Sequence, residues 1–309
     1  MRILTVAMLG FPRVVHAHPG RAPEPHDLWH AWSFEPLVIL LLLLSAAMYI
    51  AGMRRLIVRA GPGRGISTLR IAAFAAGQLA LALALLSPID AVSAALFSIH
   101  MVQHLLLVIV AAPLLVLGQP LYVMMWALGL DARRGVAAWW NRGRVLQVAW
   151  RALSHPVVAW SLHVVALWIW HAPRLYDWAL GDERIHVLEH STFLLTALLF
   201  WWVVLDRHRL RVGAATFYLF TAALQSTMLG ALLTMVKHPW YAAHLTTTAA
   251  WGLTPLEDQQ LAGLIMWIPA GAVYLIALAP RLLRVLTETG ARSVRRSGRV
   301  SRRSRADGA

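Results

Sequence analysis

Two pairs of histidines in this sequence have the spacing of metal ligands. His100 and His104 enclose Met-Val-Gln, and His186 and His190 enclose Val-Leu-Glu. At a separation of four positions, the two side chains of a pair share one face of a helix and can reach a single ion. Neutral imidazole binds copper, zinc, iron and nickel. Each pair is therefore a candidate metal site, provided that its segment is helical.

Further candidate ligands lie elsewhere in the chain. His171 lies at the end of an apolar segment, and Met228 and Met266 lie within two later ones, where a thioether would favour Cu(I). Glu189 and Asp258 could orient ligating imidazoles from a second layer. The absence of cysteine excludes thiolate zinc sites. The candidate metal ligands are His100, His104, His186, His190, His171, Met228 and Met266.

The elements that must position these residues are membrane helices. Of the 309 residues, 59% are hydrophobic and only 14% are charged, whereas soluble proteins average about 45–50% apolar and about 25% charged. Seven apolar segments are close to the length of about 20 residues that crosses a bilayer. In lipid each backbone group must be satisfied within its own segment, so we expect helices. The segments are Pro36–Met53, Thr68–Ser87, Ala91–Leu117, Pro156–Ala172, His186–Leu205, Ala214–Val236 and Leu261–Ala279.

The charges between these segments predict an orientation. Of the 28 basic residues, 22 lie after the first, third, fifth and seventh segments. The positive-inside rule then places the N-terminus outside and the C-terminus in the cytoplasm. All of the candidate ligands would lie on or toward the outer face. Because topology accounts for the positive charge, we expect membrane lipid as a partner and no nucleic acid.

This topology divides the chain into four parts. Residues 1–17 are typical of a signal peptide, although their short apolar core leaves an uncleaved tail as the alternative. Residues 18–35 would form an extracytoplasmic segment containing histidines, and residues 36–280 a seven-helix transmembrane domain. Residues 281–309 are rich in arginine and are expected to be a disordered cytoplasmic tail. The predicted fold class is all-α, in a multi-pass protein of the inner or plasma membrane.

The depth of the histidines points to function and leaves several functions open. Ionisable groups inside a membrane are costly and usually face a bundle interior, a proton path or a ligand. Histidine pairs on facing helices could ligate haem from both sides, as in a membrane electron carrier. The sequence HVLEH at 186–190 also matches the H-x-x-E-H pattern of zinc metalloproteases. A protease would need a third ligand, for which Glu257 and Asp258 are the evident acidic candidates.

The chain resembles the CtaG family of polytopic cytochrome c oxidase assembly factors through four segments in order. They are HMVQHLLLVIVAAPLLVLGQP at 100–120, WIWHAPRLYDWAL at 168–180, HVLEHSTFLLTALLFWW at 186–202 and EDQQLAGLIMWIP at 257–269. The resemblance covers most of the chain from His26 to Pro280. It implies a non-catalytic role in maturing a haem-copper oxidase, whose subunits would be partners. It further implies delivery of copper, bound transiently, from the outer face of the membrane.

Overall fold

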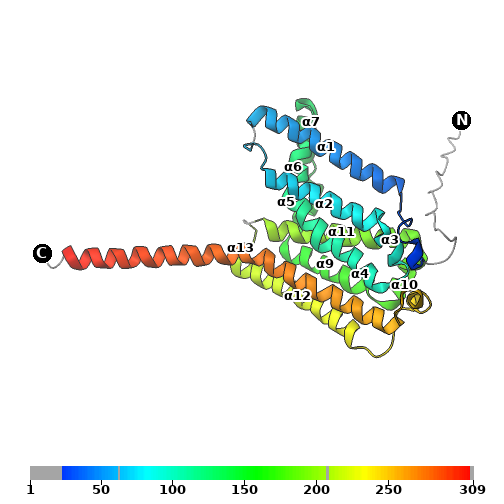
Figure 1. The fold of residues 1–309 in the computed structure, drawn as a ribbon. Coiled ribbons are helices and arrows are strands. Elements are labelled where there is room, and N and C mark those ends of the chain that lie inside the picture. The colour runs from blue at the N-terminus through cyan, green and yellow to red at the C-terminus, as the bar shows by residue number, and fades with distance from the viewer. Residues whose placement is uncertain (1–22, 62, 207–208, 307–309) are drawn as a thin grey trace.

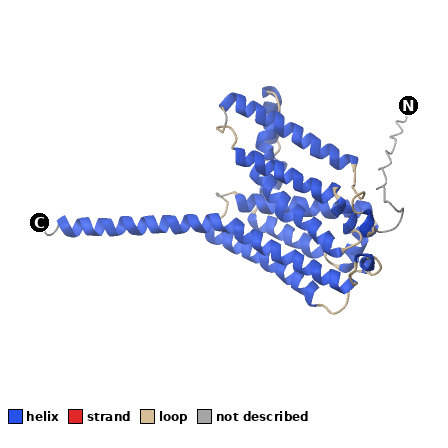
Figure 2. Cartoon of the chain, in the orientation of Figure 1, coloured by secondary structure: helices blue, strands red, loops and turns tan. Residues whose placement is uncertain are grey.

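The computed structural model describes residues 23–61, 63–206 and 209–306, and every regular element within them is helical (Figure 2). Six helices of this described part are long and apolar enough to cross a membrane. They are α1 (Pro36–Ala60), α2 (Thr68–Leu86), the composite span Phe97–Gly118, α11 (Glu183–Leu205), α12 (Val212–Met235) and the first part of α13, Pro255–Pro280. The predicted all-α membrane fold is confirmed, while the predicted signal segment 1–17 lies outside the described residues.

The seventh predicted span is a shorter helix. It is α9 (Pro156–Trp170), which has 15 residues and a length of about 22 Å. The helix α8 (Arg144–Leu153) precedes it at a bend of 67°, and only the two together are long enough to cross. Pro156 explains the break, because a proline disfavours the helical conformation of the residue before it. The pair α8 and α9, broken before Pro156, is therefore the candidate for the seventh crossing.

Short helices lie at both ends of the bundle. At the end where α1 begins are η1 (Pro25–Asp27), α3 (Pro88–Ser93), α10 (Pro173–Gly181), η3 (Ala242–His244) and η4 (Thr248–Trp251). We call this the histidine end. At the opposite end, the arginine end, are α6 (Pro120–Met125), α7 (Leu130–Arg142) and α8. None of the described residues of α7 and α8 is buried.

The composite span occupies the middle of the bundle (Figure 1). It consists of α4 (Phe97–Leu105), the π-helical turn η2 (Leu106–Ala111) and α5 (Ala112–Gly118). Its neighbours are α2 and α11 on either side and α13 at its beginning, while α12 packs along α13. In the apolar stretch of the composite span, 56% of the residues are buried, whereas in that of α1 only 11% are buried. The composite span is thus enclosed by protein, and α1 is exposed at the edge.

The π-turn in the composite span has a local cause and a partner. Pro113 has no N–H group, and the preceding Ala112 N–H bonds to Leu107 O, five residues back. The carbonyl of Val108 consequently lacks its usual backbone donor. The indole Nε1–H of Trp201 in α11 donates to it at 2.8 Å. This bond joins α11 to the composite span three residues from Leu105, where α4 ends.

The C-terminal part of the chain differs from the expected disordered tail. The helix α13 runs from Pro255 to Ala306 and continues away from the bundle as one rod (Figure 1). The expectation of disorder rested on low apolar content, but a helix satisfies its own backbone hydrogen bonds without packing. Arginine and alanine have high helix propensity, and the sequence has no proline after Pro280. These local preferences account for the helix at 281–306.

Candidate metal centre

The first histidine pair is positioned by an acidic residue of another helix. Asp258 of α13 accepts hydrogen bonds from the backbone N–H groups of Phe97 at 2.7 Å and Ser98 at 3.1 Å. These groups begin α4 and have no partner within the helix, so a buried carboxylate there stabilises the helix start. His100 follows two residues later, and its side chain and that of Asp258 are fully buried. Asp258 fixes the position of α4 and, contrary to our expectation, its carboxylate bonds to backbone rather than to an imidazole.

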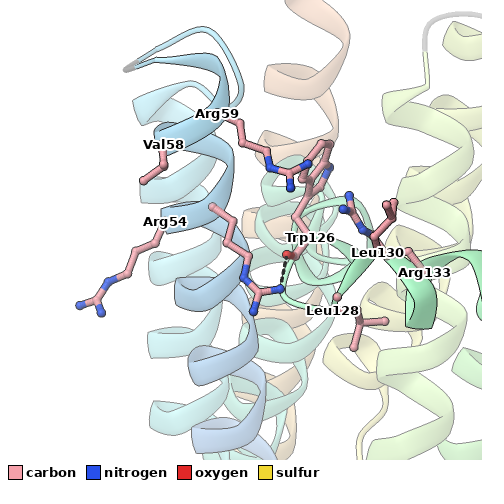
Figure 3. A pocket seen from close by; sticks show the side chains of 9 residues that line it. Arg54, Val58, Arg59, Trp126, Leu128, Leu130 and Arg133 are labelled. Carbon is pink, nitrogen blue, oxygen red and sulfur yellow. Dashed lines mark hydrogen bonds between the residues drawn. The ribbon is translucent and has the colours of Figure 1, made fainter.

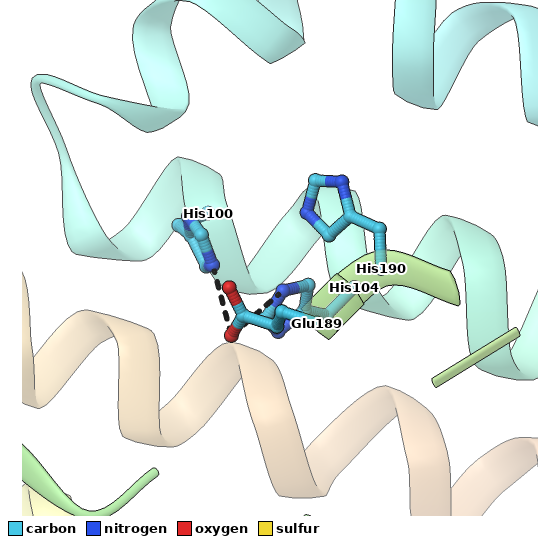
Figure 4. Close-up of side chains that lie close together, drawn as sticks. All are labelled: His100, His104, Glu189 and His190. Carbon is cyan, nitrogen blue, oxygen red and sulfur yellow. Dashed lines mark ion pairs between the residues drawn. The ribbon is translucent and has the colours of Figure 1, made fainter. Parts of the chain in front are cut away.

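The carboxylate of Glu189 lies between the two imidazoles of the first pair (Figure 4). Its Oε1 atom is 3.7 Å from His100 Nε2 and 3.6 Å from His104 Nε2. Both separations are too long for hydrogen bonds. Two ligands bound about 2.1 Å from one tetrahedral ion stand about 3.4 Å apart. The separations of 3.6 and 3.7 Å are therefore closer to the spacing of two ligands on one metal ion than to the length of a hydrogen bond.

His190 completes a group of four candidate ligands. One ligand atom from each of His100, His104, Glu189 and His190 lies within 4.8 Å of every other. The four side chains are between 0 and 9% exposed. His186 is less buried and adjoins the group, with its ring centroid 4.2 Å from that of His190 and 5.5 Å from that of His100. The two histidine pairs predicted from spacing thus face each other.

Hydrogen bonding leaves this group unsatisfied. Among the described residues, no hydrogen-bond partner contacts either oxygen of Glu189 or any ring nitrogen of His100 and His104. The Nε2 atom of His190 also lacks one. Buried polar atoms are costly when unpaired, and nearly all find a partner in folded proteins. A cation bound among three imidazole nitrogens and one carboxylate would satisfy these atoms together, and such a donor set suits zinc, copper or iron.

The remaining predicted ligands divide into two groups. Met228 is 50% exposed on the outside of α12 and is not part of the cluster. Met266 and His171 are buried and line a cavity of about 40 Å³ beside His104. The ring centroid of His171 is 6.2 Å from that of His104. The structure thus keeps Met266 and His171 near the four candidate ligands, whereas Met228 is on the surface of the bundle.

Two residues near the centre were not predicted from the sequence. The hydroxyl of Tyr176 is hydrogen-bonded to His244 Nε2 at 2.7 Å, and the Tyr176 ring lies 5.0 Å from that of His100. Burial of His244 in the loop at the histidine end lowers its pKa to about 4. Burial also raises the pKa of Tyr176 well above its usual value. Both are therefore neutral near pH 7. Tyr176 lies in the resembling segment 168–180, whereas His244 lies outside all four resembling segments.

Comparison with known proteins places the chain in a family. The family model of the cytochrome c oxidase caa3 assembly factor (Caa3_CtaG) matches residues 47–288. An uncharacterized protein of Mycobacterium leprae (strain TN) is 26% identical over 255 residues, which are 79% of this chain and 38% of that protein. Uncharacterized proteins of Mycobacterium bovis and Mycobacterium tuberculosis are each 26% identical over 273 residues, 86% of this chain and 41% of theirs.

The present chain spans about two fifths of the length of these relatives. No solved structure matches it. The family model, in contrast, extends over most of the chain, and its range includes α4, α11 and the first part of α13, which carry the buried cluster and the carboxylate that positions it. The protein therefore belongs to the cytochrome c oxidase caa3 assembly factor family.

Proposed function

We propose that this protein handles copper during the assembly of a haem-copper oxidase and is not itself a catalyst. The cargo ion binds at His100, His104, Glu189 and His190, near the histidine end of the bundle. The observation that carries the proposal is the set of four ligand atoms, buried within 4.8 Å of one another, on the spans of an oxidase assembly factor. Copper is the cargo because imidazole ligands bind it and the oxidase requires it.

The direction of delivery follows from the charge of the chain. The arginine-rich loops all lie at the arginine end, so the positive-inside rule turns the histidine end outward. A copper ion acquired outside the cytoplasm reaches the centre through the histidine end, past the partly buried His186. A centre without thiolates releases Cu(I) more readily than a cysteine site does. Ready release is what a transient carrier needs.

The two alternative functions gain no support from the geometry. A porphyrin between two histidines needs a wide slot, and the cavity beside His104 is only about 40 Å³. In the protease pattern Glu189 would activate a water while other residues bind zinc. Here the Glu189 oxygen stands within 3.7 Å of the Nε2 atoms of both His100 and His104, in the place of a ligand. A carboxylate used as a ligand is not available as a base.

Metal analysis of the purified protein with an absorption spectrum tests this proposal. We expect bound copper, no Soret band and no proteolytic activity. The double variant His100→Leu/His104→Leu should lose the copper, and His155→Leu, which changes an exposed histidine at the arginine end, should retain it. A Soret band would instead establish the electron carrier, and zinc with proteolysis would establish the metalloprotease. Equal copper content in the double variant and the control would refute the proposed centre.

A further inference from the structure

A second pair of donor atoms lies beside the metal centre. The Nε2 atom of His171, which follows α9, is 3.2 Å from Sδ of Met101 in α4. Both side chains are buried, with 4% and 1% of their surface exposed. Met101 immediately follows His100 in the sequence, so its side chain leaves α4 in a different direction from the first pair. The thioether of Met101, a soft donor, therefore lies on a different side of α4 from the harder imidazole donor of His100.

The protonation state of His171 can be assigned from its other nitrogen. Nδ1 lies 2.7 Å from the carbonyl oxygen of Leu167, one turn earlier in α9. A carbonyl oxygen only accepts, so Nδ1 must carry the proton. In the neutral ring Nε2 is then unprotonated and directs a lone pair at the thioether of Met101. A doubly protonated ring would avoid this but would place a cation in a buried, largely apolar site.

The lone pairs of His171 Nε2 and Met101 Sδ face each other, because the two atoms are only 3.2 Å apart. Neither atom can donate a hydrogen bond to the other, and an electron-pair acceptor would turn the contact into an attraction. Met101, His171 and Met266 all line the cavity of about 40 Å³, and His104 of the metal centre forms another part of its wall. This volume holds one ion or a few water molecules. Two thioethers and one imidazole form a soft donor set, which selects Cu(I).

We propose that His171 and Met101, with Met266 on the cavity wall, form a Cu(I)-selective site adjoining the centre at His100, His104, Glu189 and His190. The inference rests on the proposed function and adds that the cargo is bound in its cuprous form. His104 borders both sets of ligands, so an ion can move between them without crossing an apolar barrier. Zinc, which binds thioethers poorly, would occupy only the His/Glu set.

X-ray absorption on the purified full-length protein, loaded anaerobically with one equivalent of Cu(I), tests this site. We expect sulfur among the copper ligands of the wild type. Met101→Leu should reduce the sulfur contribution and weaken Cu(I) binding at least tenfold while leaving Zn²⁺ binding unchanged. Met228→Leu makes the same chemical change at a half-exposed methionine of α12 and should have no effect.

Each other outcome has a distinct meaning. Bound copper with only nitrogen and oxygen ligands would overturn the soft site and leave the proposed function intact. No copper binding by the wild type would overturn both. If Met101→Leu fails to fold, selenomethionine-labelled wild type provides the same information, because selenium absorption would detect copper next to the labelled side chains. No copper neighbour at selenium would contradict the proposal.

A different observation at the arginine end carries an independent proposal. A pocket of about 330 Å³ lies between the end of α1 and the segment joining α6 to α7, and none of its lining residues is acidic. Four arginines line it: Arg54, Arg55, Arg59 and Arg133. The guanidinium carbons of Arg133 and Arg59 lie 4.4 and 5.7 Å from the ring centroid of Trp126. Figure 3 shows the Arg59 guanidinium beside that ring and the Arg54 side chain pointing away.

This pocket has the charge and location of an anion site at the membrane surface. The Nε atom of Arg133 is buried and has no hydrogen-bond partner among the described residues. Arginine side chains bind phosphate oxygens through paired N–H groups. The adjacent α1 is the least buried of the six candidate spans, and Val58 in its last turns is 85% exposed. We infer that the pocket binds the phosphate of an anionic phospholipid headgroup.

Native mass spectrometry of protein extracted from membranes containing phosphatidylglycerol tests this inference. The wild type should retain the anionic lipid, and Arg59→Gln/Arg133→Gln should lose it. Arg134→Gln, which removes a neighbouring exposed arginine outside the pocket, should retain it. Equal retention by the double variant and the control would overturn the inference. Displacement of the lipid by millimolar inorganic phosphate, with phosphate then bound, would show that free phosphate is the occupant instead.

Discussion

The Oε1 atom of Glu189 lies 3.6 Å from Nε2 of His104, and neither side chain has a hydrogen-bond partner among the described residues. The two side chains come from different spans, α11 and α4. A buried carboxylate without a partner destabilises a membrane protein unless a cation compensates it. In the proposed metal centre, this uncompensated carboxylate would lower the stability of the metal-free protein and raise its affinity for a metal ion.

Replacing Glu189 with leucine separates these two effects. In the presence of chelator, Glu189→Leu should unfold at an equal or higher temperature than the wild type, because it removes the uncompensated carboxylate. The increase in melting temperature on adding metal should disappear. At a metal concentration 100 times Kd this increase corresponds to about 2.7 kcal/mol. Thermal unfolding in detergent, with and without metal, measures both quantities.

Glu183→Leu is the matched control, because Glu183 is exposed in the first turn of the same helix. It should preserve the stabilisation by metal. Preserved stabilisation in Glu189→Leu, or a metal-free variant that melts well below the wild type, would contradict the assignment of Glu189 as a ligand.

The hydrogen bond from Trp201 to Val108 predicts a contrast between two neighbouring tryptophans. Trp201→Phe leaves the carbonyl at the π-turn without a donor and should lower the free energy of unfolding by about 1–3 kcal/mol. Trp202→Phe removes an indole N–H that has no partner among the described residues and should cost less. Unfolding of both variants in the same detergent provides the comparison. Equal losses would show that packing of the indole ring, and not the bond, stabilises the turn.

The Tyr176–His244 bond predicts a loss of stability at low pH. The pKa of His244 is lowered by burial to about 4, below its usual 6.5, so the unfolded chain binds the proton more readily. The contribution of His244 to the free energy of unfolding is then fully present above about pH 6.5. It decreases as the pH falls toward 4, by up to about 3 kcal/mol. Buried Asp90, whose pKa burial raises to about 6, acts in the opposite direction over much of this range.

His244→Gln isolates the contribution of the histidine, because glutamine can still form a hydrogen bond with the tyrosine hydroxyl but does not titrate. The free energy of unfolding should be measured for both proteins from pH 7 to pH 4. The wild type should lose more of it than the variant as the pH falls. A difference that stays constant across this range would exclude protonation of His244 as its cause.

The positive-inside arrangement predicts the sides of two loops. Reporter fusions after Arg64, at the arginine end, and after Gly181, where α10 ends, should report the cytoplasm and the outside respectively. The physical reason is that 22 of the 28 basic residues follow the first, third, fifth and seventh apolar segments of the sequence. The same side for both fusions would refute this topology and the delivery of copper from outside.

The sequence predicts the spans and the paired histidines better than the contacts between helices. Hydropathy identifies a helix, and a spacing of four identifies its shared face, but neither specifies which face turns inward. Met228 and Met266 are equally apolar in sequence, yet only Met266 is buried. Glu189 and Asp258 carry the same group, yet one lies among imidazoles and the other binds the start of α4. These differences depend on helix packing, which residue types alone do not specify.

The copper content of the oxidase itself tests the central claim most directly. The test uses cells in which the only copy of this assembly factor carries His100→Leu/His104→Leu. Membrane insertion and abundance of the variant should remain nearly normal, because leucine suits a bilayer helix better than histidine. The purified oxidase should contain haem but lack copper, and added copper should partly restore it. The His155→Leu strain should yield a normal enzyme. Normal copper occupancy with the double variant as the only copy would contradict the account.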